Sequence, residues 1–499
     1  MDVLSGLYQG FAISLTLTNI MYCSIGVTIG TLIGVLPGIG PVATLSLIIP
    51  TTFSMAPVSA IILLAGVYYG AAYGGSTTAI LVNVPGEVGS MMTCIDGYQM
   101  ARNGRAGAAL GVSAIGSFVG GTLGTIGLIF LAVPLSKIAL KIGPPEYFGL
   151  MCMGLMLVIF LARGSMLKAI TMALVGILLS SIGIHVATGQ PRFTMNITEL
   201  LDGVGLVPVI MGVYGISEVI LNLEEGVEQE IFVNTKVKEL LPNREEWGRS
   251  VMPILRGTFL GFILGIFPGG GVTISSIVSY AVEKRLHKYP KKFGTGMIEG
   301  VAGPETANNA STSGAFVPLF TLGIPPNVTM AVFLGAMMIY GVAPGPLLIK
   351  EHPEVFWGVV CSMYLGNVLL IILNLPLINL WVKILKIPYR ILFPLILLFC
   401  VIGAYSLNNK TFDIGVMTFF GLIGYIMRKL NYEVPPLVLA YVVGPIIEQA
   451  LEQSLSISHG SYAIFFNRPI SAIAIFLALT MLASNFLPGV KLRREKIKE

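Results

Sequence analysis

Charged residues are scarce in this chain of 499 residues, since Asp, Glu, Lys and Arg make up 11% of it and hydrophobic residues make up 55%. Soluble domains carry roughly a quarter charged residues, so the composition excludes a soluble globular protein. Apolar stretches of about 20 residues, the length that spans a bilayer, recur from residue 8 to residue 487. These stretches are continuously apolar and do not alternate with polar residues, which predicts helices and excludes a transmembrane β-barrel. We therefore expect an all-α polytopic membrane protein.

Cysteine and histidine are also sparse, and their spacing predicts neither a metal site nor a disulfide framework. The five cysteines are odd in number and scattered, and the four histidines fall near expected loops without metal-ligand spacing. The segment GTGMIEG at 294–300 lacks the Lys-Ser/Thr pair that completes a nucleotide-binding loop. The net charge of +5 is modest, and no nucleic-acid partner is expected. We expect no cofactor, and no metal beyond Na⁺ as a coupling ion.

Glycine and proline, by contrast, are plentiful and recur in the same order in two parts of the chain. The segment GVLPGIG at 34–40 is followed by Ser-Thr-Thr at 76–78, and GIFPGGG at 265–271 is followed by Ser-Thr-Ser at 311–313. Further matches keep this order, among them NVPG at 83–86 with GIPP at 323–326. An ordered series of this kind predicts an internal duplication. The predicted organisation is repeat 1 over 8–222, a cytoplasmic linker over 223–250, repeat 2 over 251–487 and a basic cytoplasmic tail over 488–499.

Lysine and arginine are distributed oppositely in equivalent loops of the two repeats. Five basic residues lie between 284 and 292 in repeat 2, whereas the equivalent loop of repeat 1, at 50–57, has none. The next loop reverses this difference, with Arg102 and Arg105 in repeat 1. Because short cytoplasmic loops are enriched in Lys and Arg, the repeats are predicted to have inverted topology. The ranges assigned to the cytoplasm are 87–106, 222–250, 284–292 and the C-terminus, and those assigned to the outside are 50–57 and 451–467.

Four segments rich in glycine, proline and hydroxyl residues are predicted to interrupt membrane helices. Backbone that leaves the helix at membrane depth survives where it lines protein or a water-filled cavity, so such segments indicate a site. We expect re-entrant hairpin tips at 37–41 and 268–271, because proline removes a donor and glycine tolerates unusual backbone angles. We also expect discontinuous helices, unwound near 73–78 and 303–313. The helix N-termini created by such breaks bind anions without a buried arginine.

These segments supply the candidate site residues, which fall into a substrate group and a cation group. Oxygen ligands suit hard cations, so the candidates for binding Na⁺ or H⁺ are Glu305, Asn308 and Asn309. The candidate substrate-binding residues are Pro37, Gly38, Gly40, Gly75, Ser76, Thr77, Thr78, Pro268, Gly269, Gly270, Gly271, Asn309, Ser311, Thr312 and Ser313.

The same residues also have structural interpretations that the sequence leaves open. A Pro-Gly pair is commonly a turn at the membrane surface, although its recurrence at corresponding positions favours a site. Ser76, Thr77, Ser311 and Thr312 equally suit helix packing, because small and hydroxylated residues are common where membrane helices touch. Glu305 is equally compatible with a surface loop.

The motifs GVLPGIGP, YYGAAYGGSTTAIL, GIFPGGG and GPETANNASTSGAFVPLFTLGIPP, in this order, resemble the signature segments of the large membrane subunit of tripartite tricarboxylate transporters. The resemblance covers essentially the whole chain. It implies a multi-pass carrier of the bacterial inner membrane that imports citrate or related carboxylates with Na⁺ or H⁺ and without ATP. It also implies two protein partners, a small transmembrane subunit and a periplasmic solute-binding protein, besides the carboxylate substrate and membrane lipid.

Three other functions compete with this interpretation. The large subunit of the tripartite ATP-independent periplasmic transporters follows the same logic, but its motifs fit less well. An anion channel is a further alternative. An intramembrane enzyme would need paired titratable groups at membrane depth, and the four aspartates lie near segment ends without forming such a pair. We therefore expect a transporter and no enzyme, with both hairpin tips and both unwound helices forming one site that is alternately exposed.

Overall fold

The computed structural model describes residues 3–36, 40–161, 165–185, 188–225, 241–267, 271–385 and 389–484. Most of both predicted hairpin tips, most of the linker and the basic tail lie outside the described residues. Within the described ranges the regular secondary structure is helical, apart from one pair of two-residue strands. Eight of the described helical segments are long and apolar enough to cross a membrane, namely Leu17–Val35, Pro57–Val82, Val88–Ala139, Leu206–Glu224, Arg244–Ile266, Pro353–Asn374, Thr411–Lys429 and Val434–Ile457. The prediction of an all-α polytopic membrane protein is confirmed.

The chain divides into two compact units that differ from the two predicted repeats. Unit 1 comprises Met1–Ser136 and Glu218–Leu407, and unit 2 comprises Lys137–Ser217 and Asn408–Glu499. Each predicted repeat thus supplies its N-terminal part to unit 1 and its C-terminal part to unit 2. Each unit is assembled from segments far apart in the sequence.

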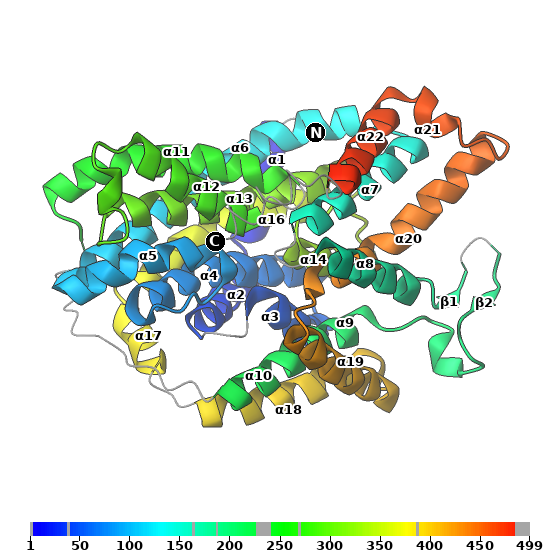
Figure 1. Cartoon of the computed structure of the whole chain (residues 1–499), viewed down its shortest axis with the longest axis horizontal. Coiled ribbons are helices and arrows are strands. Elements are labelled where there is room, and N and C mark those ends of the chain that lie inside the picture. The colour runs from blue at the N-terminus through cyan, green and yellow to red at the C-terminus, as the bar shows by residue number, and fades with distance from the viewer. Residues whose placement is uncertain are drawn as a thin grey trace. The chain divides into compact units, whose positions relative to one another are not determined.

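Unit 1 holds the longest buried helices, labelled in Figure 1. Its first segment contains α1 (Val3–Ser14), α2 (Leu17–Val35), α3 (Gly40–Ile48), η1 (Ile49–Thr52), α4 (Pro57–Val82), η2 (Val88–Ser90), α5 (Met91–Met100), the π-helical turn η3 (Ala101–Arg105) and most of α6 (Ala106–Ala139). Its second segment contains most of α10 (Ser217–Glu225), then α11 (Arg244–Ile266), α12 (Gly271–Leu286), η7 (Pro290–Lys292), α13 (Glu299–Leu322), α14 (Val328–Ile339), α15 (Leu348–Glu351), α16 (Pro353–Asn374), α17 (Ile378–Leu385) and α18 (Tyr389–Asn408).

Unit 2 contains the remaining helices and the strand pair. Its elements are α7 (Pro144–Leu161), α8 (Met166–Ser180), β1 (Gly183–Ile184), β2 (Pro191–Arg192), η4 (Thr198–Leu200), α9 (Leu206–Ile210), η5 (Met211–Ile216), α19 (Thr411–Lys429), α20 (Val434–Ile457), α21 (Ile464–Asn467) and α22 (Pro469–Ser484). The strands pair in antiparallel register, with Gly183 opposite Arg192.

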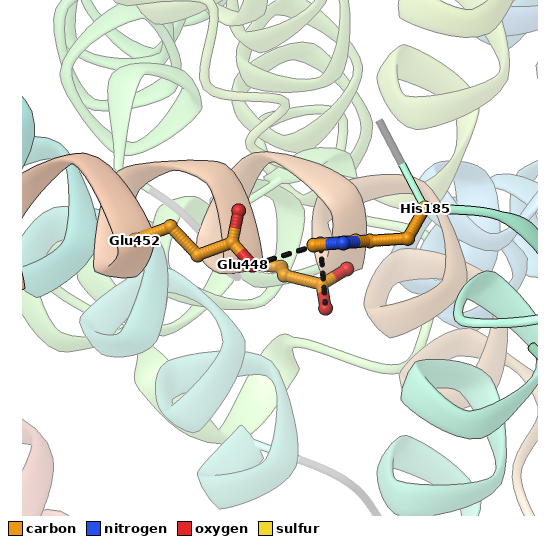
Figure 2. Close-up of side chains that lie close together, drawn as sticks. All are labelled: His185, Glu448 and Glu452. Carbon is orange, nitrogen blue, oxygen red and sulfur yellow. Dashed lines mark ion pairs between the residues drawn. The ribbon is translucent and has the colours of Figure 1, made fainter. Parts of the chain in front are cut away.

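Ion pairs join the strand pair of unit 2 to α20. Arg192 donates to both carboxylate oxygens of Glu448, at 2.5 and 3.0 Å. The Nε2 atom of His185 lies 2.8 Å from Glu452 and 3.8 Å from Glu448 (Figure 2). One arginine already satisfies Glu448, so we interpret this cluster as a network of ion pairs that anchors the strands to the helix.

Regularly spaced glycines let two helix pairs of unit 1 pack backbone against backbone. In membranes, small residues at every fourth position permit this close approach and replace the hydrophobic effect as the source of helix association. Cβ atoms added at these positions would overlap main-chain atoms of the partner helix at Gly26, Gly30 and Gly34 on α2, which face α4, and at Gly257, Gly261 and Gly265 on α11, which face α13. The helices α2 and α11 thus carry glycines at the same spacing, and each of them ends just before one of the two Pro-Gly segments.

The prediction of unwound helices near 73–78 and 303–313 was wrong. Residues 73–78 lie inside the continuous helix α4, and residues 303–313 lie inside the continuous helix α13. Hydroxyl groups in these segments bond to carbonyls of the same helix, as Ser76 does to Tyr73 (2.8 Å) and Thr312 to Asn308 (3.1 Å). Such back-bonding is compatible with an intact helix. Small residues that indicated breaks serve close packing instead, since Gly74 faces the main chain of α2.

We expect Gly261→Ala to destabilise the protein strongly, because its Cβ would overlap the Ala307 main chain of α13. Overpacking in a well-packed interior costs about 1–3 kcal/mol, and contact with backbone places this substitution at the upper end. The matched control is Gly248→Ala on the same helix, where an added Cβ meets nothing within 4 Å. Thermal unfolding of both variants in detergent checks the expectation. Equal melting temperatures would contradict the packing argument.

Candidate functional site

The middle of α13 carries an unusually polar and fully buried surface. Glu305, Asn308, Asn309, Ser311 and Thr312 all lie there with their side chains shielded from solvent. The helix packs against α4, α5, α11 and α12, so polar groups on it meet side chains from both halves of the sequence. Burial of this many polar groups is costly unless they are paired or bind a ligand.

Residues 83–90 follow α4 and are called the 83–90 loop. Glycines let this loop pack closely against the neighbouring helices. Asn83 ends α4 in the left-handed conformation, with φ of 59°. A Cβ on Gly86 would overlap the Gly34 carbonyl at the end of α2. A Cβ on Gly75 of α4 would come within 2.7 Å of Glu87 and 3.0 Å of Ser90. The small size of Gly75 therefore makes room for this loop beside α4.

Glu87 in the 83–90 loop reaches across to α13. Its Oε1 atom accepts a hydrogen bond of 2.8 Å from Nδ2 of Asn308, and its side chain is buried. The main chain of Gly89 lies so close to both side chains that a Cβ there would overlap the Asn308 Oδ1 and Glu87 Oε1 atoms. Ser276 of α12 donates to the Gly89 carbonyl at 2.5 Å. Helices α12 and α13 of repeat 2 thus hold the 83–90 loop of repeat 1 in place.

Glu305 is a second buried carboxylate on the same side of α13. The Thr93 hydroxyl of α5 donates to its Oε1 atom. The Ser90 hydroxyl faces the same carboxyl group, yet Ser90 Oγ and Glu305 Oε2 lack a hydrogen bond of ordinary geometry among the described residues. The Glu87 carboxylate is near enough to act on Glu305 electrostatically. Two carboxyl groups are therefore held near each other in the buried interior of unit 1.

These two carboxylates differ from the other buried glutamates of unit 1. Arg249 donates to Glu299 at 2.7 and 2.8 Å, and Arg256 donates to Glu283 at 2.8 Å and through a second hydrogen bond. Within the described part of the chain, no Lys, Arg or His forms an ion pair with Glu87 or Glu305. A buried carboxyl group without a cationic partner needs a full set of hydrogen-bond donors, a proton or a bound cation.

The loop after α13 makes the complementary contact with α4. Asn327 accepts a hydrogen bond of 2.9 Å from the Met330 amide at the start of α14 and donates to the Tyr68 hydroxyl of α4 at 3.3 Å. Thr312 of α13 faces the same hydroxyl. Gly271, the first residue of α12, lies beside Asn327. The 83–90 loop, which follows α4, therefore contacts α13, and the loop that follows α13 contacts α4.

Several predicted site residues lie at helix ends in this region. Gly40 begins α3 with φ of 64°, and Gly271 begins α12 with φ of 44°, a conformation that favours glycine at both places. Thr78 donates to the Val35 carbonyl at 2.8 Å and so satisfies the end of α2. Ser76 and Thr77 are buried. The remaining hairpin residues, Pro37, Gly38, Pro268, Gly269 and Gly270, lie outside the described residues.

Other predicted site residues on α13 contact different neighbours. Asn309 donates to the Ser117 hydroxyl of α6 at 2.7 Å, and Ser313 donates to a main-chain carbonyl of α6 at 3.2 Å. The Ser311 main chain packs against Gly265 of α11. Asn308 and Thr312 instead meet Glu87 and Tyr68. The structure therefore brings the cation candidates Glu305 and Asn308 together with the 83–90 loop, whereas Asn309 points to α6.

Sequence reasoning missed Glu87, Ser90 and Thr93, which complete this cluster. A carboxylate after a predicted turn has the appearance of a surface residue, and nothing local indicates burial. The repeat contained a usable signal, since Glu87 follows NVPG at 83–86 exactly where Asn327 follows GIPP at 323–326. Both side chains prove to reach the opposite repeat.

Asp96 has a structural role that the sequence did not indicate. Its buried Oδ1 atom accepts hydrogen bonds of 2.8–2.9 Å from the main-chain amides of Gly294, Gly296 and Met297. Its Oδ2 atom accepts a hydrogen bond of 2.9 Å from the Tyr280 hydroxyl. These four donors stabilise the carboxylate and fix the segment that leads into α13.

Comparison with known proteins extends these observations. The family model of the tripartite tricarboxylate transporter TctA family matches residues 20–439. The chain is 48% identical over 497 residues, 100% of its length and 99% of the relative's, to an uncharacterized 52.8 kDa protein in the TAR-I ttuC′ 3′ region of Agrobacterium vitis. It is 47% identical over 237 residues, 48% of its length and 98% of the relative's, to an uncharacterized protein in the TAR-II ttuC′ 3′ region of that organism. No solved structure matches the chain.

The family match spans every described element from α2 to the first residues of α20, and a relative is aligned along the whole chain. It includes the 83–90 loop, α13 and the loop that follows α13. The chain belongs to the tripartite tricarboxylate transporter TctA family, whose members are membrane components of tricarboxylate transport.

Proposed function

We propose that this chain is the large transmembrane subunit of a binding-protein-dependent secondary transporter. It imports tricarboxylates of the citrate type, or related carboxylates, by symport with Na⁺ or H⁺. A periplasmic solute-binding protein delivers the substrate, and a small transmembrane subunit completes the complex. The protein resides in the bacterial inner membrane with its C-terminus in the cytoplasm. The family membership supports transport, and the substrate, coupling ion and partners are our proposal.

The observation that carries this proposal is the crossed contact between α4 and α13. Polar groups from both long helices and both following loops meet in the interior of unit 1, although such groups are costly to bury. The Tyr68 hydroxyl accepts a hydrogen bond from Asn327 and keeps its own proton to donate to a carboxylate, with Thr312 and the start of α12 at Gly271 nearby. Glu87 and Glu305 supply oxygen ligands for a cation nearby. An anion site next to a cation site is what symport requires.

Inverted topology of the two repeats is part of the proposal and rests on the opposite distribution of Lys and Arg in equivalent loops. Two structural features support the duplication itself. The glycine faces of α2 and α11 occupy corresponding places in the sequence, and each post-helix loop contacts the other repeat. Residues assigned to the cytoplasm by their charge also contact one another. Arg105, in the assigned range 87–106, pairs with Glu246, in the assigned range 222–250.

The competing interpretations are separable from this one. The family match favours the tricarboxylate type over the tripartite ATP-independent periplasmic type. Counterflow of labelled substrate distinguishes a carrier from an anion channel, since a carrier exchanges substrate across the membrane without net flux. An intramembrane enzyme would modify the carboxylate, which product analysis during uptake detects.

We expect Thr312→Val to lower carboxylate uptake by at least about tenfold, the effect of losing a hydrogen bond to a charged group, because the hydroxyl turns from the Asn308 carbonyl to the substrate when the substrate binds. The matched control is Thr321→Val, since Thr321 is also buried on α13 and donates to its own helix, to the Val317 carbonyl at 2.7 Å. It lies about two and a half turns farther along the helix. Uptake of labelled citrate and related acids into vesicles containing the full complex is the measurement. Equal uptake by both variants would exclude Thr312 from the site.

The proposed orientation predicts opposite accessibility of two exposed residues on 3₁₀ turns, Lys291 in η7 and Thr51 in η1. An impermeant maleimide applied to intact spheroplasts should label Thr51→Cys and leave Lys291→Cys unlabelled until the membrane is opened. Labelling of the unsubstituted chain provides the background, since its native cysteines are buried or half-buried. The reverse pattern would invert the topology, and identical labelling would refute the charge-based assignment.

A further inference from the structure

Glu87 of the 83–90 loop and Glu305 of α13 are buried near each other, and neither has a cationic partner among the described residues. Removing a carboxylate from water is costly unless a proton, a cationic side chain or a metal cation compensates the charge. Arginine compensates Glu283 and Glu299, and main-chain amides together with Tyr280 compensate Asp96. Glu87 and Glu305 each accept fewer hydrogen bonds than Asp96, chiefly from the neutral side chains of Asn308 and Thr93. A bound cation would supply the compensation that these few donors do not.

We propose that Glu87 and Glu305 bind one sodium ion between the 83–90 loop, α5 and α13. This proposal extends the proposed symport by naming the coupling ion and its ligands. The role of the site in coupling rests on that proposed function. Neutral oxygen ligands come from Asn308 and Ser90. Glu87, Ser90 and their contacts with α13 are what the structure adds to the cation candidates Glu305 and Asn308.

Buried oxygen atoms without hydrogen bonds converge on this place. Glu305 Oε2, Asn308 Oδ1 and Ser90 Oγ are each buried and lack a hydrogen-bond partner among the described residues. The Gly89 main chain lies against Asn308 Oδ1 and Glu87 Oε1 together, and the Gly75 main chain lies against Glu87 and Ser90. Ser90 in turn faces Glu305. These contacts link two carboxyl groups, an amide oxygen and a hydroxyl in one buried cluster.

The kind of unsatisfied atom favours sodium over a proton. A proton shared by the carboxylates would neutralise charge, but it would leave the Asn308 amide oxygen, which only accepts hydrogen bonds, without a partner. A hard cation takes several oxygen ligands at once, including carboxylate, amide and hydroxyl oxygens. One monovalent ion satisfies the neutral oxygens and reduces the repulsion between the two carboxylates. It also leaves a net negative charge that the Thr93 and Asn308 donors stabilise.

Sodium at this place would act on the proposed carboxylate site through α13. Asn308 offers its side chain to the cation cluster, and its carbonyl accepts the hydrogen bond of the Thr312 hydroxyl. Thr312 faces Tyr68 on the carboxylate side. An ion that fixes Asn308 therefore fixes the turn that presents Thr312. Binding of one ligand should favour binding of the other, as coupling requires.

Thermal unfolding of the full chain in detergent, without any carboxylate, tests the site directly. Replacing potassium chloride by sodium chloride at constant ionic strength and pH 8 should raise the melting temperature by about 3 °C or more. Glu87→Gln, Glu305→Gln and Ser90→Ala should each abolish or reduce this rise. Ser90→Ala removes one neutral ligand without changing charge, so it remains informative where a glutamate variant does not fold.

Glu299→Gln is the matched control, because Glu299 is another buried glutamate of α13 but is paired with Arg249. It should keep the sodium-dependent rise. No sodium-specific rise in the unsubstituted chain, or a full rise in all three site variants, would overturn the proposal. Stabilisation by acid but not by sodium would also overturn it and identify a proton as the bound species.

This test is independent of carboxylate transport. If sodium stabilises the chain through these residues but no gradient drives carboxylate uptake, the sodium site stands and the proposed function fails. If uptake occurs and responds to Thr312→Val while sodium has no effect on stability, the proposed function stands and the sodium site fails.

Discussion

Close packing of helix backbones at glycine faces is the constraint on which unit 1 depends. Lipid is as apolar as leucine, so helices in a membrane associate through van der Waals contact and hydrogen bonds. The glycines of α2 and α11 bring whole stretches of main chain into contact with α4 and α13. A side chain on these faces would separate the helices. It would also move the 83–90 loop, because Gly86 rests on the Gly34 carbonyl at the end of one such face.

The site follows from this packing. Because α4 and α13 are held as rigid, buried helices, the loops that follow them have defined places to reach, and each reaches the helix of the other repeat. Glu87 and Glu305 arrive in the same interior region from positions 218 residues apart in the chain. Their charges are tolerated there only with compensation. The same burial would strengthen the attraction of the cluster for the proposed cation, because little water screens the charges.

The unwound helices expected from sequence show how small residues mislead. Glycine, serine and threonine at 73–78 and 303–313 are compatible with a broken helix and with a tightly packed one, because the same absence of a large side chain permits both. Partner helices decided between these outcomes. Gly74 meets the main chain of α2, and Gly303 and Ala307 meet glycines of α11, so the helices remain intact. A single sequence does not reveal which helix faces which.

The sequence by itself determined that the chain is an all-helical membrane protein, and its motif order indicated the transporter family. Apolar length and scarcity of charge are local properties that the bilayer imposes, so they can be read without a structure. It also identified Glu305, Asn308 and Thr312 as polar residues inside an apolar region. Only the tertiary structure decided that Glu87, Ser90 and Thr93 join them and that Asn309 turns to α6. The physical reason is that burial and pairing are set by helices brought together from distant parts of the chain, where no local pattern records the partner.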